Sequence, residues 1–400
     1  MFELYDPARQ RVPIKIWLTS LEDVEPGCLQ QAMNLANLPF IYKWVALMPD
    51  THQGYGMPIG GVIATQDYII PNAVGVDIGC GMAFVETNVH HRQLDFAEYS
   101  NLVGQIMRAV PTGFEHHKKP KPCLTMEEDE WAQKLRGQHF TELPNIEDGY
   151  YQVGTLGSGN HFIELQRDEA GMLCVMVHSG SRNFGYKVCE YFNKLAKKLN
   201  QSDSLSVPPE YDLAYLPISA PEGQDYIKWM NLALRFAREN RQAMLEVVKR
   251  ELTRLLPAIE FSGEVNAHHN YAALENHYGQ DVWVHRKGAI SARAGEPGII
   301  PGAMGSTSYI VSGLGNPESF MSCSHGAGRR MSRHQAMKQF TVQETVEDLQ
   351  SRGIAFGKRN KKDASDEARW AYKDIDEVIR NELDLVKPVK KLETLAVIKG

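Results

Sequence analysis

Residues of the kinds that bind metals, phosphates or protons are spread over almost the whole chain, from Asp50 to Lys399. Each lies in a short glycine-rich stretch or at the end of an apolar run. A site assembled from segments so far apart requires most of the chain to fold around it. We therefore predict one integrated domain over residues 1–400 rather than separable modules, and this length is ample for a large core.

Glycine-punctuated apolar runs alternate with helical patterns, which predicts a mixed α/β (α+β) fold with β-sheets flanked by helices. The clearest helical period lies between about 226 and 256, where apolar residues recur every three or four positions before Pro257. Residues 110–150 mix proline, lysine and acidic residues, and we expect a long surface excursion there. The other expected elements are strands at 62–65, 173–178, 282–285 and 309–311, and helices at 95–109, 186–199, 333–351 and 366–383.

The composition argues against several classes of protein. No stretch approaches the ~18 uncharged apolar residues of a membrane helix, and we expect neither a membrane partner nor a secretory signal. Six cysteines are too few for a disulfide scaffold and fit a reduced cytoplasm. A net charge of −6 argues against a generally nucleic-acid-coating surface, although a local basic site could still hold an RNA end. The basic run at 116–121 is typical of a solvated loop.

Five residues have side chains that bind first-row divalent metals, and they stand in glycine turns or at strand ends. Five donors with one thiolate exceed one tetrahedral site, and a bridging cysteine would allow two metals. Two metals can hold both the attacking and the leaving oxygen of a phosphoryl displacement. Ligand softness alone suggests zinc, so composition does not identify the metal. The candidate ligands are Asp77, Cys80, His161, His178 and His269.

One histidine near the C-terminus, His325, lies between small residues, and two arginines follow it. The neighbouring glycines remove side-chain bulk, so a phosphorus atom could come close to the ring nitrogen. Arginines can hold phosphate oxygens. We therefore interpret His325 as a candidate nucleophile that takes up a nucleotide covalently. Other candidate phosphate contacts are the glycine-rich turn 298–306 and Arg182, Arg293 and Arg329.

These segments, in this order, resemble the RtcB family of RNA ligases essentially from end to end. A single match would carry little weight, but all of them together over this length are highly specific. The segments that carry the resemblance are 48–54 (MPDTHQG), 75–81 (GVDIGCG), 154–164 (GTLGSGNHFIE), 178–182 (HSGSR), 268–271 (HHNY), 291–295 (SARAG), 324–329 (SHGAGR) and Lys399–Gly400.

The resemblance implies GTP- and manganese-dependent joining of RNA ends, in RNA repair or splicing. One end carries a 3′-phosphate, or a 2′,3′-cyclic phosphate that is first opened, and the other carries a 5′-hydroxyl. In that scheme His325 attacks the α-phosphorus of GTP and becomes guanylylated. The guanylyl group passes to the RNA 3′-phosphate, and the 5′-hydroxyl then displaces GMP. The natural RNA and the need for an accessory activating protein stay open.

The same resemblance implies a role for each matching residue. One manganese ion would bind Asp77, Cys80 and His161, and the second would bind Cys80, His178 and His269. Asp50 and Arg182 would assist catalysis near His325, and Tyr372 would stack on guanine. The implied GMP contacts are Asn160, His161, Phe162, Ile163, Glu164, His269, Asn270, Pro301, Gly302, Ala303, Met304, Ser308, His325, Gly326, Ala327, Gly328 and Lys399.

Two other functions fit part of the pattern. A dinuclear metallophosphoesterase would use a similar order of Asp, Asn–His and His ligands, but Cys80 would be an unusual ligand there and His325 would have no use. A non-catalytic RNA-binding or chaperone protein would leave the ligand set without purpose. Two departures from the family pattern, Asn183–Phe184 and Arg369–Trp370, touch no metal ligand but could alter which RNA is accepted.

Overall fold

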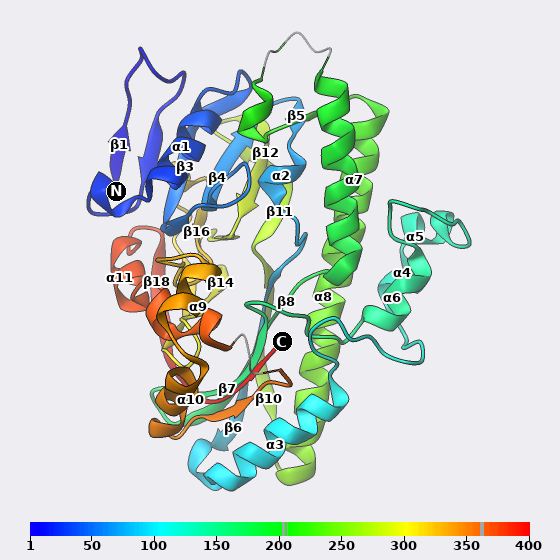
Figure 1. The fold of residues 1–400 in the computed structure, drawn as a ribbon, viewed down its shortest axis with the longest axis vertical. Coiled ribbons are helices and arrows are strands. Elements are labelled where there is room, and N and C mark those ends of the chain that lie inside the picture. Colours follow the sequence, from blue (N-terminus) through cyan, green and yellow to red (C-terminus); the bar gives the residue numbers. More distant parts are fainter. Residues whose placement is uncertain (202–204, 206, 361–363) are drawn as a thin grey trace.

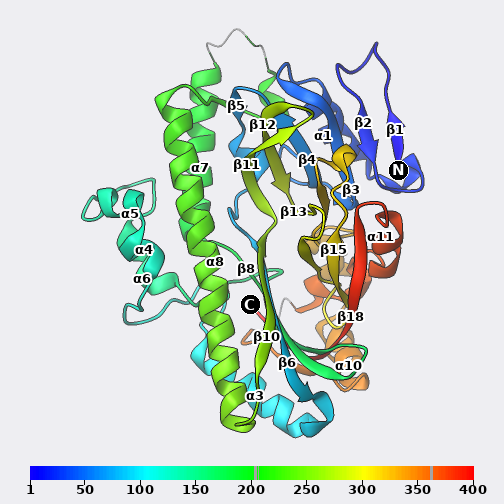
Figure 2. The same cartoon turned by 180° about the vertical axis from the view of Figure 1, so that it is seen from behind.

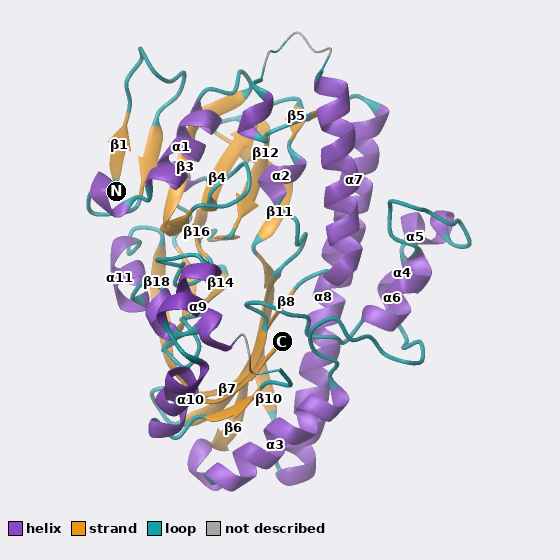
Figure 3. Cartoon of the chain, in the orientation of Figure 1, coloured by secondary structure: helices purple, strands orange, loops and turns teal. Residues whose placement is uncertain are grey.

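Two large β-sheets form the middle of the molecule, and most helices lie outside them, as the computed structural model shows (Figures 1 and 3). The structure describes residues 1–201, 205, 207–360 and 364–400. The mixed α/β class predicted from the sequence is confirmed.

The six-stranded sheet has the order β1–β2–β3–β4–β12–β11. Its inner strands are buried on both faces, since consecutive residues from Val45 to Met48 are fully inaccessible to solvent. Asp50 lies near the end of the long strand β3. The strands are β1 (Phe2–Leu4), β2 (Ile14–Ile16), β3 (Ile41–His52), β4 (Ile59–Thr65), β11 (Asn270–His277) and β12 (Gln280–Lys287).

The eight-stranded sheet has the order β10–β6–β8–β7–β18–β15–β14, with β17 beside β18. Its register places Met82 opposite His178, His178 opposite Phe162, and Phe162 opposite Lys399. The start of β6, the end of β8, the start of β7 and the end of β18 therefore meet at one edge. The strands are β6 (Gly81–His90), β7 (Phe162–Arg167), β8 (Met172–Ser179), β10 (Phe261–His268), β14 (Pro297–Ile300), β15 (Ser308–Gly313), β17 (Ala355–Gly357) and β18 (Val386–Lys399). Two short pairs complete the strands: β5 (Tyr68–Ile69) with β9 (Leu216–Pro217), and β13 (Ala289–Ser291) with β16 (Ser322–Ser324).

Two long helices, α7 and α8, run side by side along one flank (Figures 1 and 2). Aromatic side chains join them, because Phe184 of α7 lies 5.5 Å from Phe236 of α8 between ring centroids. Apolar residues on the C-terminal half of α8, including Val248 and Leu252, pack into the core under the eight-stranded sheet. The helices are α1 (Pro26–Ala36), α2 (Pro71–Val74), α3 (Phe96–Ala109), α4 (Leu124–Glu128), α5 (Glu130–Leu135), α6 (Ile146–Gln152), α7 (Arg182–Asn200), α8 (Pro221–Leu255), α9 (Arg333–Gln339), α10 (Val342–Ser351) and α11 (Ile375–Asn381).

All four predicted strands are confirmed within β4, β8, β12 and β15, and the long helix begins five residues before the predicted 226. The helix predicted at 333–351 is wrong as one element, because the chain is extended at Phe340 and Thr341, and Thr341 caps a new helix together with Glu344. The helix predicted at 366–383 is also wrong. Only Ile375–Asn381 is α-helical, since 3₁₀ turns precede it and Asp374 caps its start.

The expected excursion at 110–150 contains three short helices, α4, α5 and α6, which project from the flank of α8 (Figures 1 and 2). Within the described part of the chain, no helix combines the length and the apolar character needed to cross a membrane.

Candidate active site

Four chain segments bring ligand-type residues together at one edge of the eight-stranded sheet. Cys80 directly precedes β6, His161 directly precedes β7, and His178 lies at the end of β8. His269 follows β10, and its backbone N–H donates to the carbonyl of Cys80 at 2.8 Å. In antiparallel pairs the start of one strand lies beside the end of the next, so residues far apart in sequence become neighbours here.

Cys80, His161 and His178 form a buried cluster whose ligand atoms all lie within 4.8 Å of one another. The Cys80 Sγ atom lies 3.3 Å from Nε2 of His161 and 3.3 Å from Nε2 of His178. Each imidazole turns Nδ1 toward a backbone carbonyl, at 2.9 Å to Leu156 and 3.2 Å to Asn160. With Nδ1–H donating to these carbonyls, the Nε2 lone pairs face the cluster, as metal ligation requires.

Asp77 and His269 extend this cluster on either side. The Asp77 Oδ2 atom lies 3.1 Å from Nε2 of His161, and the His269 ring centroid lies 5.1 Å from that of His178. Two buried atoms, Asp77 Oδ1 and His269 Nδ1, have no hydrogen-bond partner in the described ranges of the chain. An orphaned buried polar atom costs about 1–3 kcal/mol, which a bound cation would remove. The five residues therefore fit a divalent metal site.

Burial sets the protonation of this cluster. It lowers the pKa of His161, His178 and His269, so the imidazoles are neutral, which is the form that binds metals. Burial also raises the pKa of the Cys80 thiol well above its ordinary value, and the Asp77 carboxylate raises it further. A cation at this place would reverse the preference of the thiol and draw off its proton.

Two buried polar residues of α8, Asn240 and Arg241, hold the backbone beneath the cluster. Nη1 of Arg241 donates to the carbonyls of Gly79, at 2.7 Å, and Ser179, at 2.9 Å. These carbonyls adjoin Cys80 and His178 in sequence. Asn240 Nδ2 donates to the Gly180 carbonyl at 3.0 Å. Neither residue was predicted from the sequence, although two adjacent polar residues within an apolar helical face are a usable signal.

Arg182 is the first residue of α7 and has a left-handed φ of 59°. Its side chain lies on the Nδ1 side of the His161 ring. Its Nη1 atom is 3.3 Å from His161 Nδ1, and its guanidinium fills the space where any β-carbon on Gly157 would stand. Its Nε atom is buried and has no partner in the part of the chain that the structure describes. Arg182, which was predicted to assist catalysis, therefore lies next to the cluster of candidate metal ligands.

His325 is held by the fully buried carboxylate of Asp50. The Asp50 Oδ2 atom accepts hydrogen bonds from Nδ1 of His325 at 2.6 Å and from its backbone N–H at 3.1 Å. With Nδ1–H donating to the carboxylate, the neutral form of the ring has its lone pair on Nε2. The His325 ring centroid lies 4.7 Å from that of His269. A histidine oriented by a carboxylate beside a metal-type cluster is equipped to act as a nucleophile.

Two further residues fix the backbone next to His325 and Asp50 through hydrogen bonds. Glu382 of the α11 C-terminus accepts hydrogen bonds from the backbone N–H of Ser324, at 2.9 Å, and from its hydroxyl. Lys373 donates from Nζ to the carbonyls of Pro49, at 3.0 Å, and Thr51, at 2.7 Å. The residues next to His325 and Asp50 are thus fixed from α11 and from the chain just before it.

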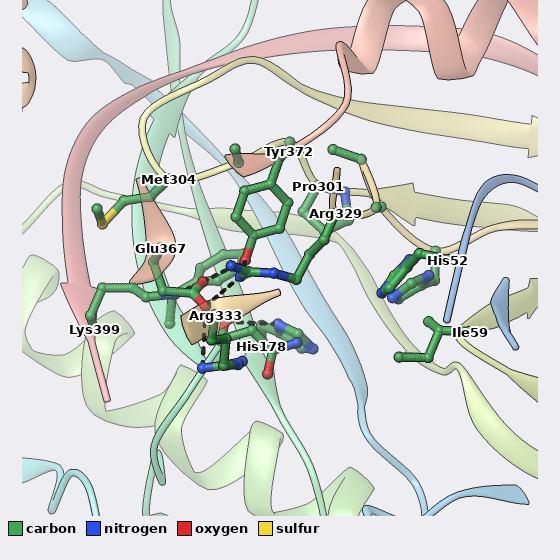
Figure 4. A pocket seen from close by; sticks show the side chains of 18 of the residues that line it. His52, Ile59, His178, Pro301, Met304, Arg329, Arg333, Glu367, Tyr372 and Lys399 are labelled. Atoms are coloured by element: carbon green, nitrogen blue, oxygen red, sulfur yellow. Dashed lines mark hydrogen bonds and ion pairs between the residues drawn. The ribbon is translucent and has the colours of Figure 1, made fainter. Parts of the chain in front are cut away.

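A hollow that is open to solvent has His325 in its lining. Figure 4 draws the side chains around this hollow. A second groove adjoins it and reaches the metal-type cluster. The predicted nucleotide contacts that line the first hollow are Asn160, Phe162, Glu164, Pro301, Gly302, Ala303, Met304, His325, Gly326, Ala327, Gly328 and Lys399.

Glu367 gathers four polar partners at one end of the hollow (Figure 4). Its carboxylate lies 3.0 Å from Lys399 Nζ and 3.3 Å from Nη1 of both Arg329 and Arg333. The Tyr372 hydroxyl donates to it at 2.8 Å. Although burial opposes the effect, the three cations lower the pKa of Glu367 below its usual range. Glu367 and Arg333 were not singled out from the sequence, because only the fold brings them to Lys399.

Some predicted contacts lie elsewhere. His269 and Asn270 line the adjoining groove. Ile163 faces the apolar core, because alternate residues of β7 point to opposite faces of the sheet. Ser308 lies behind the hollow and accepts a hydrogen bond from the N–H of Gly302 at 3.1 Å. Arg293 lines neither cavity and pairs with Glu275 at 3.2 Å, so its predicted phosphate contact is not supported.

Comparison with known proteins gives consistent matches. A model of the family described as tRNA-splicing ligase RtcB matches residues 31–400. The chain is 40% identical to RNA-splicing ligase RtcB of Escherichia coli K12 over 98% of both chains. It is 33% identical to tRNA-splicing ligase RtcB of Pyrobaculum aerophilum, over 98% of this chain and 95% of that protein. It is 31% identical to RNA-splicing ligase RtcB of Mycobacterium tuberculosis, over 92% of this chain and all of that protein.

The protein is therefore an enzyme of the RNA ligase class. It belongs to the RtcB family, as the resemblance of its motifs predicted.

Proposed function

We propose that this ligase uses GTP to join an RNA 3′-phosphate or 2′,3′-cyclic phosphate to an RNA 5′-hydroxyl, through a guanylyl group carried on His325. The hydrogen bond of 2.6 Å between Asp50 and His325 Nδ1 carries the proposal, because it directs the lone pair of the neutral ring to Nε2, and His325 lines the hollow in which the nucleotide would bind. The six cysteines are free and buried, which fits our proposal that the enzyme works in the reducing cytoplasm.

From an RNA 3′-phosphate the proposed reaction has three displacements at phosphorus, and a 2′,3′-cyclic phosphate is first opened to the 3′-phosphate by water. Nε2 of His325 attacks the α-phosphorus of GTP, a P–N bond forms and pyrophosphate leaves. An oxygen of the RNA 3′-phosphate then attacks the same phosphorus, and the P–N bond breaks to release the histidine. Finally the RNA 5′-hydroxyl oxygen attacks the 3′-phosphate and GMP leaves. Covalent transfer divides one difficult displacement into easier steps, and Asp50 would stabilise the positive charge that the ring gains in the first step.

The metal ions proposed for this reaction are two manganese ions. Asp77, Cys80 and His161 would hold one ion and Cys80, His178 and His269 the other, where they would neutralise charge on the reacting phosphates. Arg182, which lies next to His161, would add a further positive charge beside the metal ligands. Tyr372 on the wall of the hollow is the proposed stacking partner of guanine.

Replacing Asp50 with asparagine tests the orientation of His325. An amide no longer favours the tautomer with the lone pair on Nε2, so we expect self-guanylylation to slow by about 10²–10⁴-fold, as in other carboxylate–histidine pairs. Rapid-quench labelling with GTP measures this rate. Metal content should stay unchanged, and a variant that labels at the native rate would contradict the assigned role.

Glu164 supplies a pH-dependent element of the proposed nucleotide site. It lines the hollow and is almost fully buried, and burial raises its pKa to about 7. A carboxylate can accept both edge N–H groups of guanine only when it is ionised, that is, above this pKa. We expect the dissociation constant for GTP to rise about tenfold for each pH unit below about 7. Titration calorimetry of Glu164→Gln should show weaker binding without this dependence. Native binding that stays constant between about pH 5.5 and pH 8 would contradict it.

A joining assay separates the proposed reaction from phosphoester hydrolysis. RNA pairs with 3′-phosphate or cyclic phosphate and 5′-hydroxyl ends are incubated with manganese and GTP, and joined product is measured on denaturing gels. We expect product only when GTP and a 5′-hydroxyl end are both present. Release of inorganic phosphate from simple esters without joining would support a dinuclear hydrolase instead.

A further inference from the structure

The segment from Pro111 to Lys121 lies against the turn that leads into the candidate active site. The Gly113 N–H donates to the Gly157 carbonyl at 2.6 Å, and the Leu156 N–H donates to the Pro111 carbonyl at 2.9 Å. Asn160, three residues after Gly157, lines both the nucleotide hollow and the adjoining groove. The Pro111–Gly113 end of this segment therefore adjoins the turn that leads into the candidate active site.

The backbone of this segment is also fixed on its other side. The His117 N–H donates to the Tyr151 carbonyl at 3.0 Å, and the Lys121 N–H donates to the Tyr150 carbonyl at 2.7 Å, at the C-terminal end of α6. An ion pair further joins Glu115 to Arg359. A surface whose backbone is already ordered loses little conformational entropy when it binds a partner.

The side chains of this segment point into solvent in a pattern suited to RNA. Phe114 is 92% exposed and Tyr151 is 41% exposed. Lys118, Lys119 and Lys121 are exposed, and no residue that the structure describes forms an ion pair with any of them. Exposed aromatic rings stack on bases and unpaired lysines attract phosphates, which is how single-stranded nucleic acid is bound without regard to sequence.

The three lysines differ in charge from the rest of the chain around them. The chain as a whole carries a net charge of −6, which repels RNA, and the excursion turns acidic at Glu127–Glu130 shortly afterwards. The unpaired lysines lie instead at the start of the excursion, between Gly113, which contacts Gly157, and the backbone contact of Lys121 with Tyr150. A loop that was only solvated would need neither this position nor an almost fully exposed phenylalanine.

We propose that Phe114, Lys118, Lys119, Lys121 and Tyr151 form a basic–aromatic strip that binds the single-stranded RNA leading to the active site. The three lysines contact the sugar–phosphate backbone, and a base stacks on Phe114. The strip deepens the proposed function, on which it rests for the identity of the RNA ends. The strip lets the enzyme bind the nucleotides next to the reacting RNA end and select substrates with a single-stranded flank.

The test removes the three lysine charges together, in Lys118→Ala/Lys119→Ala/Lys121→Ala of the full chain. We expect KM for an RNA with a long single-stranded flank to rise about tenfold near 0.1 M salt, with kcat within about twofold of native. KM for a minimal RNA that has only the reacting ends should stay the same. The slope of log KM against log salt should fall by about 2, since single strands release about 0.7 counterion per neutralised phosphate. Phe114→Ala should raise the same KM about tenfold without changing that slope.

Matched controls make the outcome decisive. Lys194→Ala/Lys197→Ala/Lys198→Ala removes the same charge near the far end of α7, and we expect native KM values from it. Native KM and salt slope in the strip variant, or an equal loss in the α7 variant, would overturn the proposal. An equal loss on the minimal RNA would also overturn it, since that result means a distorted Gly157 turn. Binding of fluorescent single-stranded RNA without GTP, measured by anisotropy, keeps the strip testable even if no guanylylation occurs.

Discussion

Replacing His325 with alanine is expected to abolish covalent labelling by GTP and to reduce RNA joining by about 10⁴-fold or more. The reason is geometric. Among the residues lining the hollow, His325 is the histidine whose Nδ1 is held by a buried carboxylate, at 2.6 Å from Asp50. Alanine leaves no atom there that can form a bond to phosphorus. Gel assays of RNA joining and α-phosphate-labelled GTP measure both effects.

The variant should retain its fold and its metal, because His325 is not among the proposed ligands. Metal content measured by atomic spectroscopy is therefore a control within the same sample. His139→Ala, which removes an exposed histidine between α5 and α6, should keep the native level of labelling. Covalent label that persists in His325→Ala would contradict the assignment of the nucleophile.

Replacing Cys80 with alanine is expected to reduce joining by about 10³-fold or more. Its Sγ atom lies 3.3 Å from Nε2 of both His161 and His178, so it is placed between the two proposed metal positions. Without the thiolate, each ion would lose a ligand and the bridge that fixes their spacing. We expect equilibrium dialysis with manganese to show fewer bound ions.

Cys174→Ala is the matched control, because it removes a buried thiol from the same strand that carries His178. The Cys174 thiol packs in an apolar cluster and donates to a backbone carbonyl of its own strand, so joining and metal binding should be close to native in this variant. Normal ligation by Cys80→Ala would exclude a bridging role for the thiolate.

Much of the fold could be predicted because its strands are short apolar runs that end in glycine turns. The predicted helices were wrong where the local sequence and the tertiary contacts favour different structures. Residues 333–351 have the composition of one helix, yet the Thr341–Glu344 capping box starts a second helix inside it. Similarly, the side chains of Glu367 and Tyr372 turn toward Arg329, and the chain there forms short 3₁₀ turns instead of a helix.

The structure brings predicted site residues together where a motif carries the chemistry in its own side chains. Cys80, His161 and His178 each stand beside glycines or at a strand end, and the strand register brings them together. The residues that position them were missed. Arg241 acts through backbone carbonyls of distant segments, and nothing in a helical sequence identifies its partners. The side chain of Ile163 lies in the apolar core, because a contiguous motif does not reveal the alternation of side chains along a strand.

The most direct test is to identify the residue that carries the guanylyl group in the native enzyme. The protein is incubated with manganese and GTP, digested at neutral or mildly alkaline pH to preserve an acid-labile P–N bond, and its peptides are sequenced by mass spectrometry. We expect GMP on the imidazole of His325 and loss of that label when RNA with a 3′-phosphate is added. GMP on a lysine such as Lys399 or Lys287, or the absence of any labelled peptide while RNA is being joined, would contradict it.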